Sequence, residues 1–114
     1  MRSLLVLLLL ASAARAQEVE CPKRLPGIEA PKARLTGAGM YQGAEKQYEL
    51  VGERTNVAGG YDVQYGFRPN DIRWLACAYD EKYIWWEWMD PKTTSCKLQE
   101  RKVAGGVSVK LACK

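Results

Sequence analysis

Alternating apolar and polar positions predict β-strands throughout the second half of the chain. Residues 61–67 carry an aromatic or aliphatic side chain at every second position, which is the period of a strand with one buried face. Residues 107–113 repeat this alternation, and residues 72–79 are apolar on both faces apart from Arg73, as expected of a central strand. The pattern predicts a meander of four or five antiparallel strands, at residues 61–67, 72–79, 83–89, 95–102 and 107–113.

The N-terminal part of the predicted domain has a weaker pattern. Three prolines between residues 17 and 34 disfavour a regular helix there. A short edge strand at residues 19–21, followed by an extended segment, fits this composition better. Residues 35–41 contain two glycines, and the Gln-Gly pair that follows predicts a turn.

The middle of the chain leaves one assignment open. Residues 44–51 fit either one helical turn or a strand, and residues 52–60 are expected to form a polar loop. No window has a sustained helical period. The predicted fold is therefore mainly β, either a small antiparallel sheet or a partly open barrel or sandwich, held by two disulfides.

The N-terminus has the composition of a secretory signal peptide, residues 1–16. A short positive start precedes an apolar run at residues 4–10, and residues 14–16 form an Ala-Arg-Ala cleavage site. The run is too short for a transmembrane anchor, which needs about 20 residues. We therefore expect a single domain at residues 17–114, with no membrane span after cleavage, that is periplasmic or secreted in a Gram-negative bacterium.

Charge adds little to this picture. The chain has 17 Lys and Arg against 13 Asp and Glu, a formal net charge of +4, and two of the arginines belong to the predicted signal. The remaining charges are interspersed without a basic run. This distribution argues against a nucleic acid or an anionic membrane as the partner.

Four cysteines in a short exported chain predict two disulfides rather than a metal site or a nucleophile. No pair has the C-x2-C spacing of a zinc site, and the chain has no histidine to serve as a co-ligand or a partner base. The cysteines are Cys21, Cys77, Cys96 and Cys113.

Hairpin geometry favours one of the three possible pairings. A four-residue loop at residues 103–106 would place Cys96 opposite Cys113, whereas a tight two-glycine turn would place Leu98 there instead. The favoured set is Cys96–Cys113 with Cys21–Cys77, and the best alternative is Cys77–Cys96 with Cys21–Cys113.

All four tryptophans lie within one short stretch of the sequence. On a strand at residues 83–89, Trp86 and Trp88 share one face with Ile84, while Trp85 lies on the opposite face. A two-layer fold of this size buries only one face, so we expect exposed aromatic surface that can stack on sugar rings or anchor a protein partner. The alternative is that the tryptophans fill a core that is poor in Phe and Ile.

The candidate site follows from this aromatic cluster. The candidate partners are an envelope protein or a cell-wall glycan. The candidate binding residues are Trp74, Tyr83, Trp85, Trp86, Glu87 and Trp88.

Catalysis has little support in the sequence. Glu87 with Asp80 or Asp90 lies near the aromatic strand, and a carboxylate pair is enough for glycoside hydrolysis. However, no spacing singles out one pair, and no second domain is present to build a cleft. We therefore predict a protein that is not an enzyme and that uses no cofactor and no metal.

Several short motifs follow one another along residues 17–114. They are Cys21-Pro22, Leu35-Thr36-Gly37, Met40-Tyr41 with Gly43, the W-L-A-C-A-Y segment at residues 74–79, and then Cys96 and Cys113. In this order they resemble a family of small exported proteins of Gram-negative bacteria whose function is uncharacterised. The resemblance covers nearly the whole domain and implies export, disulfides and a small β-rich fold, without an established activity.

One segment departs from that resemblance. At residues 83–89 the family leads us to expect an aliphatic strand, and this chain carries three tryptophans there. Any ligand preference of this strand would therefore be the chain's own.

These observations together predict a non-enzymatic binding module with an aromatic surface. One alternative is an inhibitor of a lysozyme-type cell-wall hydrolase, by analogy of size, compartment and fold class, although the Ser-Gly and Tyr loop of such inhibitors is not evident here. Another is a structural envelope protein, for which the Gly-rich residues 36–43 would form a contact loop.

Overall fold

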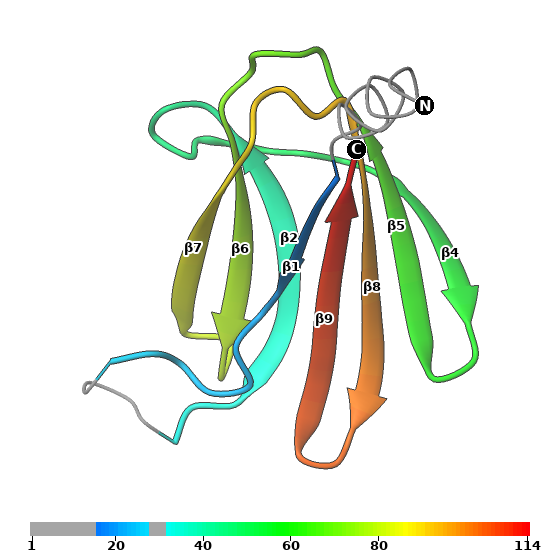
Figure 1. Ribbon diagram of the computed structural model, residues 1–114. Helices are drawn as coiled ribbons and strands as arrows, with labels where there is room; N and C mark the ends of the chain where they lie inside the picture. The colour runs from blue at the N-terminus through cyan, green and yellow to red at the C-terminus, as the bar shows by residue number, and fades with distance from the viewer. Residues whose placement is uncertain (1–15, 28–31) are drawn as a thin grey trace, which may run out of the picture.

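The computed structural model describes residues 16–27 and 32–114, and this part of the chain is all-β (Figure 1). It forms two antiparallel sheets rather than a closed barrel, which confirms the predicted mainly β class. The predicted signal peptide, residues 1–16, lies outside the described residues apart from Ala16.

The nine strands of residues 16–27 and 32–114 divide between a five-stranded and a four-stranded sheet. The first sheet has the order β1 (Gln17–Glu20), β9 (Gly106–Cys113), β8 (Ser95–Val103), β5 (Gly60–Gly66) and β4 (Glu53–Val57). The second has the order β3 (Tyr48–Glu49), β2 (Leu35–Gln42), β6 (Arg73–Tyr79) and β7 (Tyr83–Met89). Strand β2 also contacts β8 and β9, so the two sheets pack against each other.

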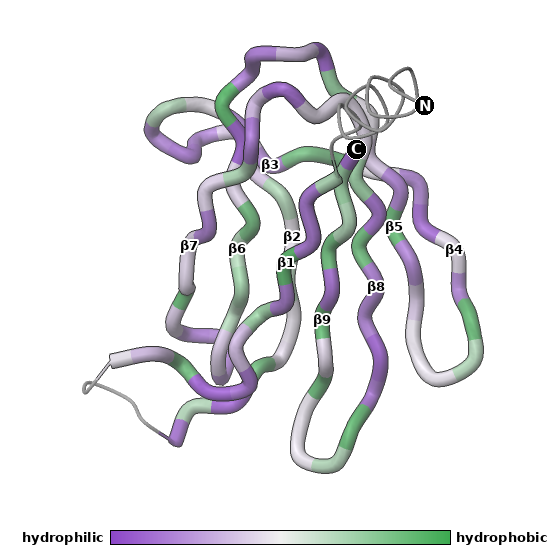
Figure 2. Tube along the Cα trace, viewed as in Figure 1, coloured by the Kyte–Doolittle hydropathy of each residue, from purple (hydrophilic) through white to green (hydrophobic). Residues whose placement is uncertain are grey.

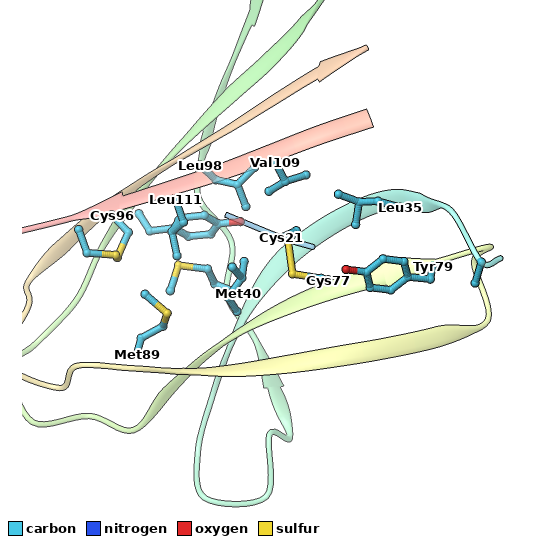
Figure 3. Close-up of a cluster of buried hydrophobic side chains, with 14 residues drawn as sticks. Cys21, Leu35, Met40, Cys77, Tyr79, Met89, Cys96, Leu98, Val109 and Leu111 are labelled. Atoms are coloured by element: carbon cyan, nitrogen blue, oxygen red, sulfur yellow. A yellow bond between two sulfur atoms is a disulfide. The ribbon is translucent and has the colours of Figure 1, made fainter. Parts of the chain in front are cut away.

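The core lies between the two sheets (Figure 3). Apolar and polar residues alternate along β9 and along the first half of β8, which gives these segments one core face, whereas the second half of β8 is hydrophilic (Figure 2). The largest core side chains are at most 1% exposed and include Met40, Leu75 and Met89 of the second sheet with Leu98 and Leu111 of the first. None of the four tryptophans is fully buried, and only Trp85 packs against the core, so the alternative that they fill the core holds for Trp85 alone and only in part.

Both disulfides form with the favoured pairing. Cys21–Cys77 joins the segment that follows β1 to the central strand β6, and so links the two sheets. Cys96–Cys113 joins directly opposite residues of β8 and β9. The β8–β9 hairpin has the register that places Cys96, not Leu98, opposite Cys113. The alternative pairing is therefore wrong. The predicted four-residue loop is also wrong, because Val103 pairs with Gly106 and leaves a two-residue turn.

The predicted C-terminal meander is also wrong. Strand β5 pairs with β4 and β8, whereas β6 pairs with β2 and β7, so the chain changes sheet after β5 and again after β7. The first change occurs in the Pro69-Asn70 segment, where Asn70 has a positive φ of 73°. Alternation along a strand shows which of its faces is buried but not which strand lies beside it. The sequence therefore predicted the strands but not their division between two sheets.

Two assignments in the first half differ from their predictions, and an open one is decided. The expected polar loop at residues 52–60 contains β4, an exposed edge strand without a core face that turns into β5 through Gly59, whose φ is 77°. The Gly-rich residues 36–43, expected as a contact loop, lie largely in β2, where the glycines pair with the small residues of β6. Of the two options for residues 44–51, the structure shows a strand, the short β3.

Arg73 is fully buried at the end of β6 and connects two loops. Its guanidinium donates to the backbone carbonyls of Arg68, Asp90 and Thr93, and it stacks on Phe67 with its Cζ atom 4.3 Å from the ring centroid. Burial lowers the pKa of this guanidinium, and the carboxylates near it act in the opposite direction. This one side chain thus links the β5–β6 connection to the β7–β8 connection, the two places where the chain passes from one sheet to the other.

Tyr79 makes the stability of the domain sensitive to alkaline pH. Its ring is fully buried, its hydroxyl donates to the carbonyl of Pro22, and burial raises its pKa from 10.0 to about 12. Below pH 10 the folded and unfolded states both hold the proton. Between pH 10 and about 12 only the folded state does, so the free energy of unfolding should fall as the pH rises, by roughly 2–3 kcal/mol.

Urea denaturation at pH 8 and at pH 11 measures this effect. Tyr79→Phe should lose about 1 kcal/mol at pH 8, the contribution of one hydrogen bond. The free energy of unfolding of this variant should also fall less steeply with rising pH than that of the parent protein. Burial also raises the pKa values of Tyr61 and Tyr65, so part of the fall should persist in the variant. Equal slopes for the two proteins would contradict the assignment to Tyr79.

Candidate binding surface

Strand β7 divides the predicted site residues between two faces, as its alternation requires. Ile84 and Trp88 point away from the core and are 47% and 52% exposed. Tyr83 and Trp85 lie on the other face and pack against the edge of the core. The strand has the predicted bounds and the predicted division of side chains.

The outward face of β7 continues across the neighbouring strands. The register places Trp74 of β6 opposite Trp88, and Tyr41 of β2 opposite Trp74. The rings of Tyr41 and Trp86 make an edge-to-face contact with centroids 5.2 Å apart. We call this set of outward side chains the aromatic face: Tyr41, Trp74, Ile84, Trp86 and Trp88.

A shallow groove of about 260 Å³ crosses the sheet beside the aromatic face. Small residues form its floor, because glycines of β2 pair with alanines of β6. Two carboxylates, Glu49 and Glu81, lie at its margin together with the apolar side chains of Tyr41 and Ile84. The groove therefore combines an apolar floor with hydrogen-bond acceptors at its rim.

A lysine from the loop before β3 covers one end of the aromatic face. Lys46 has a positive φ of 58°, and its ammonium lies 4.2 Å from the ring centroid of Trp74 and 5.5 Å from that of Trp86. The same loop accepts a hydrogen bond of 2.9 Å from Trp74 Nε1 through the carbonyl of Gly43. These contacts hold two of the indole rings in place before any ligand binds.

The other three candidate residues lie away from the aromatic face. Trp85 Nε1 donates to Glu87 Oε1 at 3.1 Å, and the Lys82 ammonium lies 5.3 Å from the ring centroid of Tyr83. Tyr83 and Trp85 thus pack along the core edge, and Glu87 accepts a bond from its neighbour on the same strand. The structure separates them from Trp74, Trp86 and Trp88.

The carboxylates considered for catalysis have other contacts. Asp80 Oδ1 accepts a hydrogen bond of 3.0 Å from the Arg34 amide, and Asp90 Oδ1 accepts one of 2.9 Å from the Lys92 amide. Asp80 thus joins the β6–β7 turn to the residue before β2, and Asp90 stabilises the turn after β7. Among the described residues, no cluster of three or more acidic or cysteine side chains could hold a metal ion.

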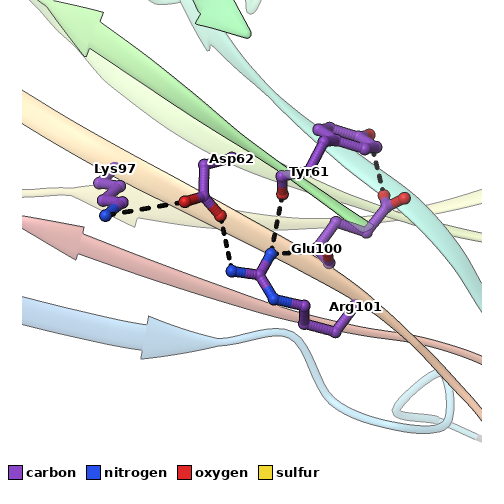
Figure 4. Close-up of polar contacts among 5 residues, drawn as sticks. All are labelled: Tyr61, Asp62, Lys97, Glu100 and Arg101. Atoms are coloured by element: carbon purple, nitrogen blue, oxygen red, sulfur yellow. Dashed lines mark hydrogen bonds and ion pairs between the residues drawn. The ribbon is translucent and has the colours of Figure 1, made fainter. Parts of the chain in front are cut away.

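The five-stranded sheet has a different outer surface (Figure 4). On that surface Asp62 forms ion pairs of 2.8 Å with Arg101 and 3.7 Å with Lys97. Tyr61 donates to Glu100 at 3.0 Å on the opposite face of the same strands, which faces β2. Each of these charged or polar side chains thus has an ion-pair or hydrogen-bond partner within the same sheet. Exposed aromatic side chains gather on the four-stranded sheet instead, which makes it the better candidate for recognition.

Two members of the site were missed by sequence reasoning. Tyr41 lies more than thirty positions from the tryptophans, and only the pairing of β2 with β6 brings it to the aromatic face. Lys46 reaches the same face from a turn. Neither residue carries a local signal in the sequence, since both placements depend on strand order.

The fold and the site together define a small two-sheet β-domain with two disulfides and one aromatic outer face. Two disulfides in a domain of this size are consistent with an oxidising, extracytoplasmic location. In the described part of the chain, no helix has the length and apolarity to cross a bilayer. No protein-family model, no curated protein and no solved structure matches the chain.

Proposed function

We propose that this chain is an exported, non-enzymatic binding module whose aromatic face binds a cell-wall glycan. The observation that carries the proposal is the exposure of Trp88 and Ile84, at 52% and 47%, on the same face as Trp74 and Trp86. A contiguous apolar surface on a small domain is unfavourable in water and is typical of a binding site. Trp74, Trp86 and Trp88 do not pack against the core, which supports a role in recognition.

The chemistry of the surface supports a glycan as the ligand. A sugar ring has an apolar face of C–H groups, which packs on an indole ring, and a rim of hydroxyl donors. Glu49 and Glu81 lie at the margin of the groove, where they can accept hydrogen bonds from hydroxyl or acetamide groups. The groove is open and shallow, which suits an extended chain of sugars better than a small enclosed ligand.

The proposed location places the module beside such a ligand. Cleavage of the signal peptide after residue 16 would release residues 17–114 into the periplasm of a Gram-negative bacterium. Both disulfides would form in that compartment. The cell wall is the glycan that an exported domain meets there.

Titration with soluble cell-wall glycan fragments tests the proposal. We expect tryptophan emission to change on binding, because Trp74, Trp86 and Trp88 lie on the binding face. Trp88→Ala should weaken the affinity roughly tenfold, since loss of one stacking contact removes about 1.4 kcal/mol. Calorimetry measures the affinity independently of the fluorescence.

Val103→Ala is the matched control for Trp88→Ala. Val103 is 51% exposed, almost the same as Trp88, but lies at the end of β8 in the other sheet. Its replacement should leave the affinity unchanged. A glycan panel that changes neither emission nor calorimetric heat would show that the ligand class is wrong, and turnover of a fragment that Glu87→Gln abolishes would show that the protein is an enzyme.

A further inference from the structure

Strand β7 presents an unpaired backbone edge. It is the outermost strand of the four-stranded sheet and pairs only with β6, and no backbone hydrogen bond within the described residues links its other edge to the rest of the chain (Figure 1). Such an edge is a template for another strand. Its seven residues are paired to β6 in a continuous register without a bulge.

The other sheet edges are less suited to pairing. Strand β3 has two residues, β1 has four with two glutamates, and every residue of the polar β4 is exposed. Proteins block edges with proline, lysine, bulges or short strands, and β7 has none of these between Tyr83 and Met89. It also carries exposed apolar side chains near both of its ends, at Ile84 and Trp88.

We propose that two copies of the chain pair through β7, antiparallel, around a two-fold axis at Trp86. In this register Ile84 of one copy lies opposite Trp88 of the other, and the two Trp86 residues face each other. Trp85 lies opposite Glu87, so its indole N–H meets a carboxylate, as it already does within one strand. Every residue of β7 gains a partner of suitable chemistry.

Other registers fit less well. An axis at Glu87 would place two carboxylates directly opposite each other, which is unfavourable. An axis at Trp85 would leave Trp88 and Met89 beyond the end of the partner strand. A shift of the register by one residue would place each outward side chain opposite an inward one, so neither face of the sheet would continue into the partner. The sequence of β7 is therefore complementary to itself in one register.

The paired strands would form one eight-stranded sheet from two four-stranded sheets. The two Ile84–Trp88 contacts would place the most exposed apolar side chains of β7 side by side across the interface. An interface made by one strand is small, so we expect reversible association in the micromolar range. The aromatic faces of the two copies would then form one continuous surface.

Sedimentation velocity tests the pairing on protein recovered from an oxidising compartment with both disulfides intact. Over concentrations from about 1 to 500 µM, the average mass should rise from that of one chain towards that of two. The Ile84→Lys/Trp88→Lys variant should stay monomeric, because it places lysine opposite lysine. The Ile84→Glu/Trp88→Glu variant should also stay monomeric, and an equal mixture of the two variants should restore the dimer.

The matched control is Val57→Lys/Val103→Lys, which adds two lysines at exposed positions of the other sheet and should leave the dimer intact. A parent protein that stays monomeric to the highest concentration would overturn the proposal. A lysine variant that still dimerises, or a mixture that stays monomeric, would overturn it as well. Mass is measured without glycan, so this proposal and the proposed function can fail independently.

Discussion

Replacing Cys21 and Cys77 together with alanine is expected to lower the free energy of unfolding by about 4 kcal/mol. The two cysteines are 56 residues apart in the sequence, and their bond closes a long loop in the unfolded chain. By the loop-entropy relation, a longer loop gives a larger stabilisation. Both side chains are at most 2% exposed, so alanine is the suitable replacement because it adds no buried hydroxyl.

The second disulfide is the matched control for the first. Cys96 and Cys113 are 17 residues apart and join two strands that a hairpin already holds together. The same relation gives about 3 kcal/mol for this pair. Urea denaturation of the two double-alanine variants measures both effects. A larger loss from the Cys96/Cys113 pair would contradict the view that the bond between the sheets contributes more.

Arg73→Ala is expected to destabilise the domain by about 3–5 kcal/mol. The side chain is fully buried, and its removal takes the donor from the carbonyls of Arg68 and Thr93. The Asp90 carbonyl also loses a bond but keeps those from the amide and hydroxyl of Thr93. Each unsatisfied buried carbonyl costs about 1–3 kcal/mol, and the cavity beside Phe67 adds to this cost. Thermal unfolding followed by circular dichroism measures the loss.

Two further variants sharpen the interpretation of Arg73. Arg73→Lys keeps the positive charge but not the planar fork of donors, so we expect a loss between those of the parent and the alanine variant. Arg54→Ala removes an exposed arginine whose Cζ atom lies 3.8 Å from the ring centroid of Tyr61. That change should cost less than about 1 kcal/mol. Equal losses from Arg54→Ala and Arg73→Ala would contradict the role given to Arg73.

The sequence predicted the parts of the fold that local patterns encode. Alternation located β5, β8 and β9, and the turn residues on either side located β7. The predicted hairpin register indicated the Cys96–Cys113 bond, although the turn has two residues and not four. Strand β4 was missed because all five of its residues are exposed and no apolar face marks it. The division into two sheets was missed because it depends on which strand lies beside β6. The position of β2 beside β6 depends on packing between their glycines and alanines, and these small residues give no alternation of apolar and polar positions.

The candidate site was predicted in part for the same reason. The two faces of β7 follow from its period, so Trp86 and Trp88 were placed together correctly. Tyr41 and Lys46 join them only through the tertiary structure. Tyr83, Trp85 and Glu87 were grouped with the site because they are neighbours in sequence, whereas a strand sends neighbours to opposite sides.

The connectivity of the two disulfides has a consequence for how the protein matures. Cys21 bonds the next cysteine along the chain, Cys77, and Cys96 bonds the one after it, Cys113. Under the export proposed above, with the N-terminus delivered first, oxidising each pair as it emerges gives the native bonds directly. No mispaired intermediate has to be rearranged. Maturation should therefore require a thiol oxidase but no disulfide isomerase.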